Sequence, residues 1–180
     1  MITSTAWRLD GILLGLLTEL GTELERVEAG AYAVTLRGRR RPSTVVWLLA
    51  GEQAVAVEAF VMHVVPATAT QPGCADPGRL HRHLLARNLR LRGVHFAVDD
   101  VGDVFLRGSL PLTAIDVEGV DRVLGEVLQL LEDEQDALVA VTYGDALDRS
   151  PALAAKVLAD GAGRRPAGTS WAAPQRDTRR

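Results

Sequence analysis

The chain has 180 residues, of which 47% are apolar and 24% charged, with a formal net charge of -3 and a single cysteine. This length and composition fit one globular domain with its own core, and the single cysteine excludes an intrachain disulfide and a thiolate zinc site. The longest apolar runs fall well short of the roughly 20 residues that cross a bilayer, and the N-terminal residues lack the order of a secretory signal. We therefore expect a cytoplasmic protein that has no contact with membranes.

The first third of the chain predicts one helix followed by strands. Apolar residues recur at intervals of three and four from Ala6 to Leu20, which is the period of one helical face. Period-two segments rich in β-branched residues then predict three strands, at Tyr32 to Leu36, Thr44 to Leu49 and Ala54 to Val65. A further short strand at Glu23 to Val27 shows weaker alternation, and the sequence leaves it open.

The middle of the chain predicts a long loop and then a basic helix. Pro66 to Gly78 has no apolar period, and Asp76 followed by Pro77 is a strong helix start. The helix from Gly78 to Leu91 is expected to bury Leu80 and Leu84. Further candidates for burial are Leu85, Leu89 and Leu91. The arginines expected on the exposed side are Arg79, Arg82, Arg87 and Arg90.

A hairpin and a long acidic helix follow. Val94 to Val98 and Val104 to Arg107 alternate around a turn in which Gly102 supplies a positive φ. Asp116 is placed to cap a helix that extends past Val139, with a break allowed near Asp136. Ser150 begins a last short helix that ends at Gly161, and 161–180 has no periodicity and is expected to be a disordered tail rich in Arg, Gly and Pro. The sequence therefore predicts one α+β domain over 1–160, with an antiparallel sheet.

Several stretches of this sequence resemble the YbjN-domain proteins, in particular their actinobacterial branch. The residues that carry the resemblance are Val57 to Met62, His83 to Asn88, Gly93 to Phe96, Asp100 to Leu106, Leu110 to Leu112 and Val120 to Gly125. The resemblance implies the α-β-β-β-α-β-β-α order of type III secretion chaperones, which are commonly dimers that hold partner polypeptides. It implies no catalytic or ligand-binding residue. Gly119 departs from the pattern, which usually has an acidic residue there.

The residues that could do chemistry do not assemble into a catalytic or metal motif. His81 and His83 lie roughly 200° apart around a helix, so they do not share one metal from one face. The acidic residues around Gly102 lack the spacing of a calcium loop and are explained by a hairpin turn. Cys74 has no neighbouring base, and Glu58 is the one carboxylate that looks buried. We therefore expect no enzyme activity, no metal and no cofactor.

The basic helix is the main candidate for binding a partner. Five arginines between positions 79 and 92 have no acidic residue among them, whereas Asp116 to Asp136 carries eight acidic residues and one arginine. The basic helix is thus open to four interpretations: a solvated face, an internal or intersubunit match with the acidic helix, a surface for an acidic protein partner, or a surface for nucleic acid. Nucleic-acid binding through this helix and the Arg-rich tail is the alternative hypothesis.

The strand Ala54 to Val65 is apolar on both faces. Val55, Val57 and Val61 are expected on one face, and Phe60, Met62 and Val64 on the other. One layer of helices covers only one face of a small antiparallel sheet, so the second face needs another cover. The leading hypothesis is therefore a protein-binding module, a chaperone or a regulatory adaptor, that forms a homodimer through the sheet or the neighbouring helix. The candidate contact residues are Arg79, Arg82, Arg87, Arg90, Val57, Phe60 and Met62.

Overall fold

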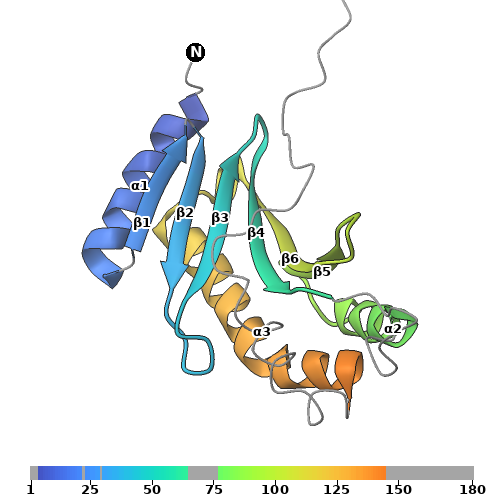
Figure 1. The fold of residues 1–180 in the computed structure, drawn as a ribbon. Helices are drawn as coiled ribbons and strands as arrows, with labels where there is room; N and C mark the ends of the chain where they lie inside the picture. Colours follow the sequence, from blue (N-terminus) through green and yellow to red (C-terminus); the bar gives the residue numbers. More distant parts are fainter. Residues whose placement is uncertain (1–3, 22, 29, 65–76, 145–180) are drawn as a thin grey trace, which may run out of the picture.

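The computed structural model describes residues 4–21, 23–28, 30–64 and 77–144 (Figure 1). Along the chain the elements are α1 (Ser4–Leu20), β1 (Glu23–Glu28), β2 (Ala31–Leu36), β3 (Thr44–Ala50), β4 (Ala54–Met62), α2 (Pro77–Asn88), β5 (Val94–Val98), β6 (Val104–Pro111), a short 3-10 helix (Leu112–Ala114) and α3 (Val117–Tyr143). The predicted last helix, the tail and the loop that holds Cys74 lie outside the described residues.

The six strands form one antiparallel sheet in the order β1-β2-β3-β4-β6-β5. The predicted α+β class is confirmed, and the order contains one strand more than the expected α-β-β-β-α-β-β-α. The additional strand is β1, the segment that the sequence left open. Its alternation is weak because Leu24 is its one half-buried residue and the other five are exposed.

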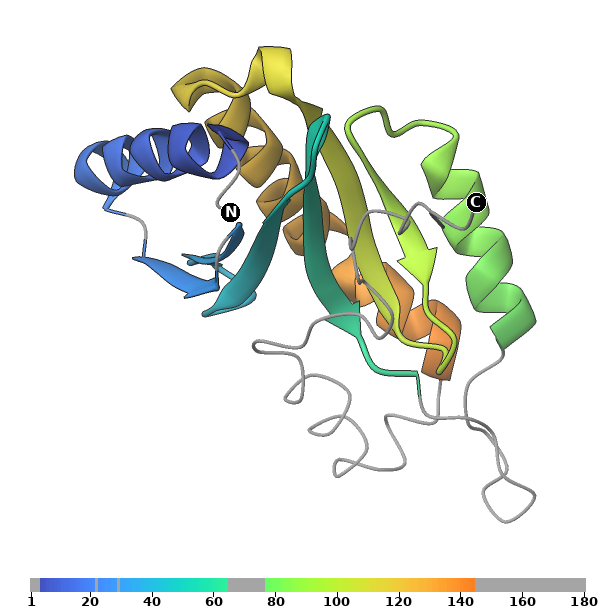
Figure 2. The ribbon, with the colours of Figure 1, turned by 90° about the horizontal axis from the view of Figure 1, so that it is seen from above.

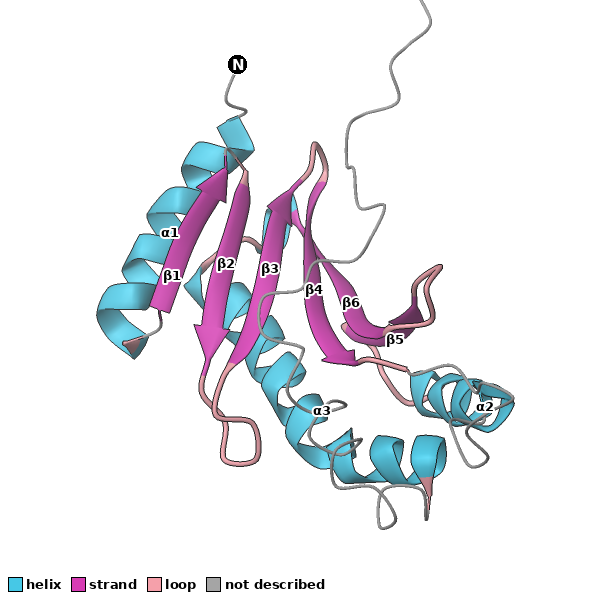
Figure 3. Ribbon diagram, in the orientation of Figure 1, coloured by secondary structure: helices cyan, strands magenta, loops and turns pink. Residues whose placement is uncertain are grey.

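Helices cover one face of the sheet. In Figure 3 the strands lie in front of α1 and α3, and Figure 2 shows α2 alongside β5 at the end of the sheet. Side chains of the covered sheet face and of both long helices form one core. Its most buried members include Leu9 and Leu13 on α1, Val57 on β4, and Val127 and Leu131 on α3, all at most 2% exposed. The core therefore lies between the sheet and the helices, and the opposite face carries no helix within the described residues.

Local signals fix the ends of these elements much as the sequence predicts. Gly102 has a φ of 91° in the β5–β6 turn, and the carboxylate of Asp99 accepts hydrogen bonds from the backbone N–H groups of Val101 and Asp103. Asp116 caps α3 by accepting from the N–H of Gly119 at 2.7 Å. A Cβ at Gly119 would collide with the carbonyl of Ala114, which explains why glycine occupies this position. No break occurs near Asp136, because α3 continues to Tyr143.

Candidate functional site

Helix α2 is fixed to the rest of the domain by its inner side. Leu80 and Leu84 are 0% and 3% exposed and belong to the core. At its last residue, the side-chain amide of Asn88 donates to the carbonyl of Phe96 at 3.0 Å and accepts from the N–H of Phe96 at 2.8 Å. Both backbone groups of Phe96 point away from β6, so this amide closes the middle of the outer edge of β5.

An ion pair to α3 accounts for one of the candidate arginines. Arg87 pairs with Glu134, a carboxylate whose side chain is 10% exposed, and Nε2 of His83 lies 3.6 Å from the same carboxylate. The internal match between the basic helix and the acidic helix, which the sequence left open, is therefore real at Arg87. This residue holds the domain together and is not free for a partner.

The other side of α2 is exposed. Leu85 is 67% exposed and Leu89 is 88% exposed, so the expectation that they might enter the core is wrong. Leu89 follows the last residue of α2, four positions after Leu85, and the helix residues three or four positions away from Leu85 share its side of the helix. We call this surface the α2 outer face; its residues are Arg79, Arg82, Leu85, Ala86 and Leu89, and all five are exposed.

Three arginines on or next to the α2 outer face have charges that no described residue neutralises. Arg82, and Arg90 and Arg92 just beyond the helix, make no ion pair with another residue that the structure describes. Two exposed leucines next to three such charges form an apolar patch with a basic border. Scattered single apolar residues are ordinary on protein surfaces, whereas contiguous apolar patches are typical of contact surfaces.

The three apolar candidates on β4 are buried. Val57 and Met62 are 1% and 2% exposed and both belong to the core under the helices. Phe60 is 3% exposed and packs edge-to-face on Phe105, with ring centroids 5.4 Å apart. The expected face for Met62 and Val64 is wrong, because the register shifts between Phe60 and Met62 and both enter the helix-side core.

The helix-free face of the sheet has a polar pair at its centre. Trp47, Glu58, Arg107 and His95 stand opposite one another on β3, β4, β6 and β5, in one row across the sheet. Glu58 is 0% exposed and pairs with Arg107, while its Oε2 has no hydrogen-bond partner among the residues that the structure describes. The sequence identified Glu58 as the buried carboxylate; its partner lies 49 residues away and could be found only through the strand register.

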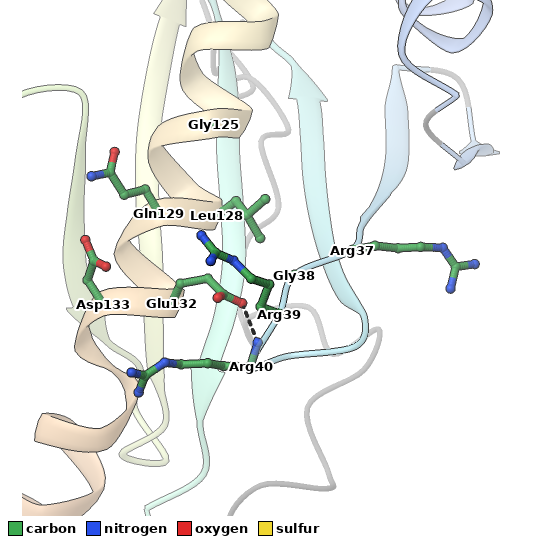
Figure 4. A pocket seen from close by; sticks show the side chains of 9 residues that line it. All are labelled: Arg37, Gly38, Arg39, Arg40, Gly125, Leu128, Gln129, Glu132 and Asp133. Atoms are coloured by element: carbon green, nitrogen blue, oxygen red, sulfur yellow. Dashed lines mark hydrogen bonds between the residues drawn. The ribbon is translucent and has the colours of Figure 1, made fainter.

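The loop between β2 and β3 is bound to α3 (Figure 4). The carboxylate of Glu132 accepts from the backbone N–H of Arg40 at 2.9 Å, and this bond, followed by others from the same loop, holds the pKa of Glu132 below its ordinary value. Arg40 pairs with Asp136. Arg41 is directed inward and donates to the carbonyls of Phe60 and Val61, and burial lowers its pKa. A groove of about 750 Å³ lies between this loop and α3.

A second pair of side chains was not visible in the sequence. Nδ1 of His63, just after β4, lies 2.5 Å from the fully buried carboxylate of Asp103, and the hydroxyl of Tyr143 donates to the carbonyl of His63 at 2.8 Å. These three residues join the ends of β4, β6 and α3.

Within the described residues no group of three or more His, Cys, Asp or Glu side chains is arranged to hold a metal ion. No described helix is long and apolar enough to cross a membrane.

Two solved structures share the architecture. One chain of the ExsC–ExsE complex aligns with a TM-score of 0.56 and 17% identity, over 74% of this chain and 95% of that chain. A chain of the HopA1–SchA chaperone–effector complex aligns with a TM-score of 0.53 and 12% identity, over 76% of this chain and 99% of that chain. At such identities the likeness shows the fold alone. It confirms the type III secretion chaperone-like fold that the sequence resemblance implies.

The sequence itself defines the family. Residues 10–140 match the model of the YbjN family, described as "Putative bacterial sensory transduction regulator", and the chain belongs to this family. The uncharacterized protein Rv0487 of Mycobacterium tuberculosis is 37% identical over 123 residues. That alignment covers 66% of this chain and 61% of Rv0487, so the match spans about three fifths of the relative's length.

Proposed function

We propose that this protein is a non-enzymatic protein-binding module of the cytoplasm, a chaperone or a regulatory adaptor, that works as a homodimer. The α2 outer face is the observation that carries the proposal. It presents Leu85 on α2 and Leu89 directly after the last residue of this helix, and the inner side of the helix is fixed by Leu80, Leu84, Asn88 and Arg87. A fixed, exposed apolar patch binds without first having to be ordered, which lowers the entropic cost of association.

The fold neighbours support the choice of a protein as the partner. The ExsC–ExsE and HopA1–SchA structures are both complexes of two proteins, and the second is a chaperone with its effector. The exposed leucines of the α2 outer face favour this face, rather than the helix-free face of the sheet, as the surface that contacts the partner. The centre of that sheet face is filled by Phe60, Phe105 and the Glu58–Arg107 pair, and Phe60, Phe105 and Glu58 are at most 3% exposed.

Salt separates self-association from the binding of an acidic partner. Two copies that meet through Leu85 and Leu89 bring arginines of the same sign together, so screening by salt strengthens the dimer. An acidic protein or a nucleic acid is attracted by the same arginines, so salt weakens that complex. The sign of the salt effect therefore identifies the partner class without knowing the partner.

Sedimentation velocity of the full chain tests the homodimer. We expect a species of twice the 19.3 kDa chain mass at concentrations up to about 100 μM, more abundant at high salt. Leu85→Asp should give a monomer, because it places a charge in the apolar contact. Leu14→Asp is the matched control, since Leu14 is 59% exposed on α1, away from α2. A wild-type monomer over this range, or a dimer that survives Leu85→Asp, contradicts the homodimer.

Nucleic-acid binding is the second candidate function. The observation that favours it is that Arg82, Arg90 and Arg92 form no ion pair with a described residue. It predicts that affinity for duplex DNA falls steeply with salt and falls further in Arg82→Gln and Arg90→Gln. Leu85→Asp should then have a much smaller effect than it has on a dimer. The net charge of -3 opposes general affinity for nucleic acid. Absence of salt-sensitive binding at low ionic strength rejects this alternative.

A further inference from the structure

The groove between the β2–β3 loop and α3 is lined from two sides (Figure 4). Residues 37–40 of the loop form one side. The other side is a single stripe of α3 made of Gly125, Leu128, Gln129, Glu132 and Asp133, which follow one another at intervals of one, three and four residues. This stripe is about 12 Å long, because a helix rises about 1.5 Å per residue. The groove volume of about 750 Å³ is within the range of small-molecule sites, about 300 to 1,000 Å³.

Most charged groups along this groove already have partners. Arg37 pairs with Glu23 at 2.6 Å, and Figure 4 shows its side chain directed away from α3. Arg40 pairs with Asp136, and the carboxylate of Glu132 accepts from backbone N–H groups of the loop. These groups fix the loop to the helix. Two residues of opposite charge that line the groove remain without an ion pair to a described residue.

Arg39 and Asp133 are those two charges. Figure 4 shows the Arg39 side chain reaching from the loop across α3, and the Asp133 side chain on the helix itself. Neither forms an ion pair with the other or with any residue that the structure describes. The pKa of Glu132 is lowered first by the backbone N–H of Arg40, and the backbone N–H and the charge of Arg39 add to this effect. A ligand that carries only a negative charge would meet repulsion from the carboxylates of the helix, and one that carries only a positive charge would meet Arg39.

Gly125 keeps one end of the groove open. A glycine inside a helix is less favourable than almost any other residue, so it normally has a packing reason. At Gly125 a Cβ would meet nothing within 4 Å. Packing therefore does not require this glycine, and its effect is to leave space beside Gln129.

We propose that this groove binds a small zwitterion of amino-acid or dipeptide size, with its carboxylate at Arg39 and its ammonium group at Asp133. A guanidinium offers paired donors to a carboxylate, and a carboxylate accepts from an ammonium group. The amide of Gln129, one turn before Asp133 and exposed, is placed to meet the polar backbone of such a ligand. The proposal concerns a surface remote from the α2 outer face in sequence and does not rest on the protein-binding function.

Calorimetric titration of the full chain tests the chemistry of the ligand. The probes are glycine, L-glutamine and glycylglycine, with acetate and methylammonium as the two single-charge controls. At least one zwitterion should bind with a Kd below about 1 mM, and the controls should bind at least about tenfold more weakly. Arg39→Gln and Asp133→Asn should each weaken the zwitterion by about tenfold or more. Arg82→Gln, which removes the same charge from α2, should change nothing.

Filling the groove tests its location. Gly125→Leu should abolish binding while the melting temperature stays the same or rises, because leucine favours a helix more than glycine does. Gly125→Ala reports the backbone effect with a much smaller side chain. The proposal is overturned if no zwitterion binds up to about 10 mM. It is equally overturned if acetate binds as tightly as the zwitterions, or if binding survives both Arg39→Gln and Gly125→Leu.

Discussion

The two sides of α2 differ in almost every respect, although they belong to the same twelve-residue helix. The inner side has core leucines, an amide that closes a strand edge and an arginine in an ion pair with α3. The outer side has the exposed Arg82 and Leu85, and the exposed Leu89 follows the last residue of the helix. Adjacent positions such as Leu84 and Leu85, 3% and 67% exposed, therefore have different roles. The inner side explains why the helix is stable, and the outer side is available for binding.

Substituting those adjacent leucines gives the largest expected difference. Leu84→Ala should lower the free energy of unfolding by about 2 to 5 kcal/mol, the range for a buried leucine. Leu85→Ala should change the stability of the monomer by less than about 0.5 kcal/mol, as at other exposed sites. Urea unfolding at low protein concentration measures both. Equal losses in the two variants would abolish the distinction between the two sides.

The arginines provide a second matched pair. Arg87→Ala leaves the largely buried carboxylate of Glu134 without its ion pair, so we expect a loss of about 1.5 to 3 kcal/mol, the range for hydrogen bonds to charged groups. Arg82→Ala removes the same charge from the outer side, where stability should be nearly unchanged. The same unfolding measurement compares them. A loss in Arg82→Ala as large as that in Arg87→Ala would show that the outer arginines also support the fold.

The amide of Asn88 allows a finer test of the inner side. Asn88→Ala leaves the N–H and the carbonyl of Phe96 without this partner, although water reaches an exposed edge, so we expect a loss of about 1 kcal/mol. Hydrogen exchange at the Phe96 amide measures the local effect. Its protection should fall in the variant. Amides in the centre of the sheet, such as that of Val57, should lose only the protection that corresponds to the change in the free energy of global unfolding. Unchanged protection of Phe96 would mean that another group covers this edge.

The smallest effect concerns Glu132, which holds the β2–β3 loop in the way that Glu134 holds α2. Its folded-state pKa lies below the ordinary value of 4.5, first because of the N–H of Arg40. Its contribution to stability is therefore present above that ordinary value and is lost as the pH falls through the lowered pKa. Glu132→Gln should flatten the acid side of the melting-temperature profile slightly. An identical slope in variant and wild type would show that this contact does not contribute.

The sequence predicted the fold well because most of its signals are local. Hydrophobic period located α1, α2, α3 and the five strands β2 to β6, and Gly102 and Asp116 marked a turn and a helix start that the structure contains. The same rule failed at Leu85 and Leu89. They have the spacing of a buried stripe, and only the position of α2 at the end of the sheet decides that nothing in the described domain covers them.

The candidate site was less accessible to sequence reasoning, because it depends on contacts between distant segments. A shift of strand register after Phe60 directs the side chain of Met62 into the helix-side core, and no pattern in the sequence of this strand marks that shift. The pairs His63–Asp103 and Arg107–Glu58 join residues 40 and 49 positions apart. Their members are visible in the sequence one at a time, and each looks ordinary until the strand order is known.

The amide of Asn88 also limits how copies of this protein can assemble by sheet extension. It fills the middle of the outer edge of β5, so among the described elements the uninterrupted edge is that of β1. Two molecules that extend their sheets into one continuous sheet therefore pair through the β1 edge of each. Such an assembly stops at a dimer, because no uninterrupted edge of a described strand is left for a third molecule. A repeating fibril needs two open edges on every subunit, and this domain offers one.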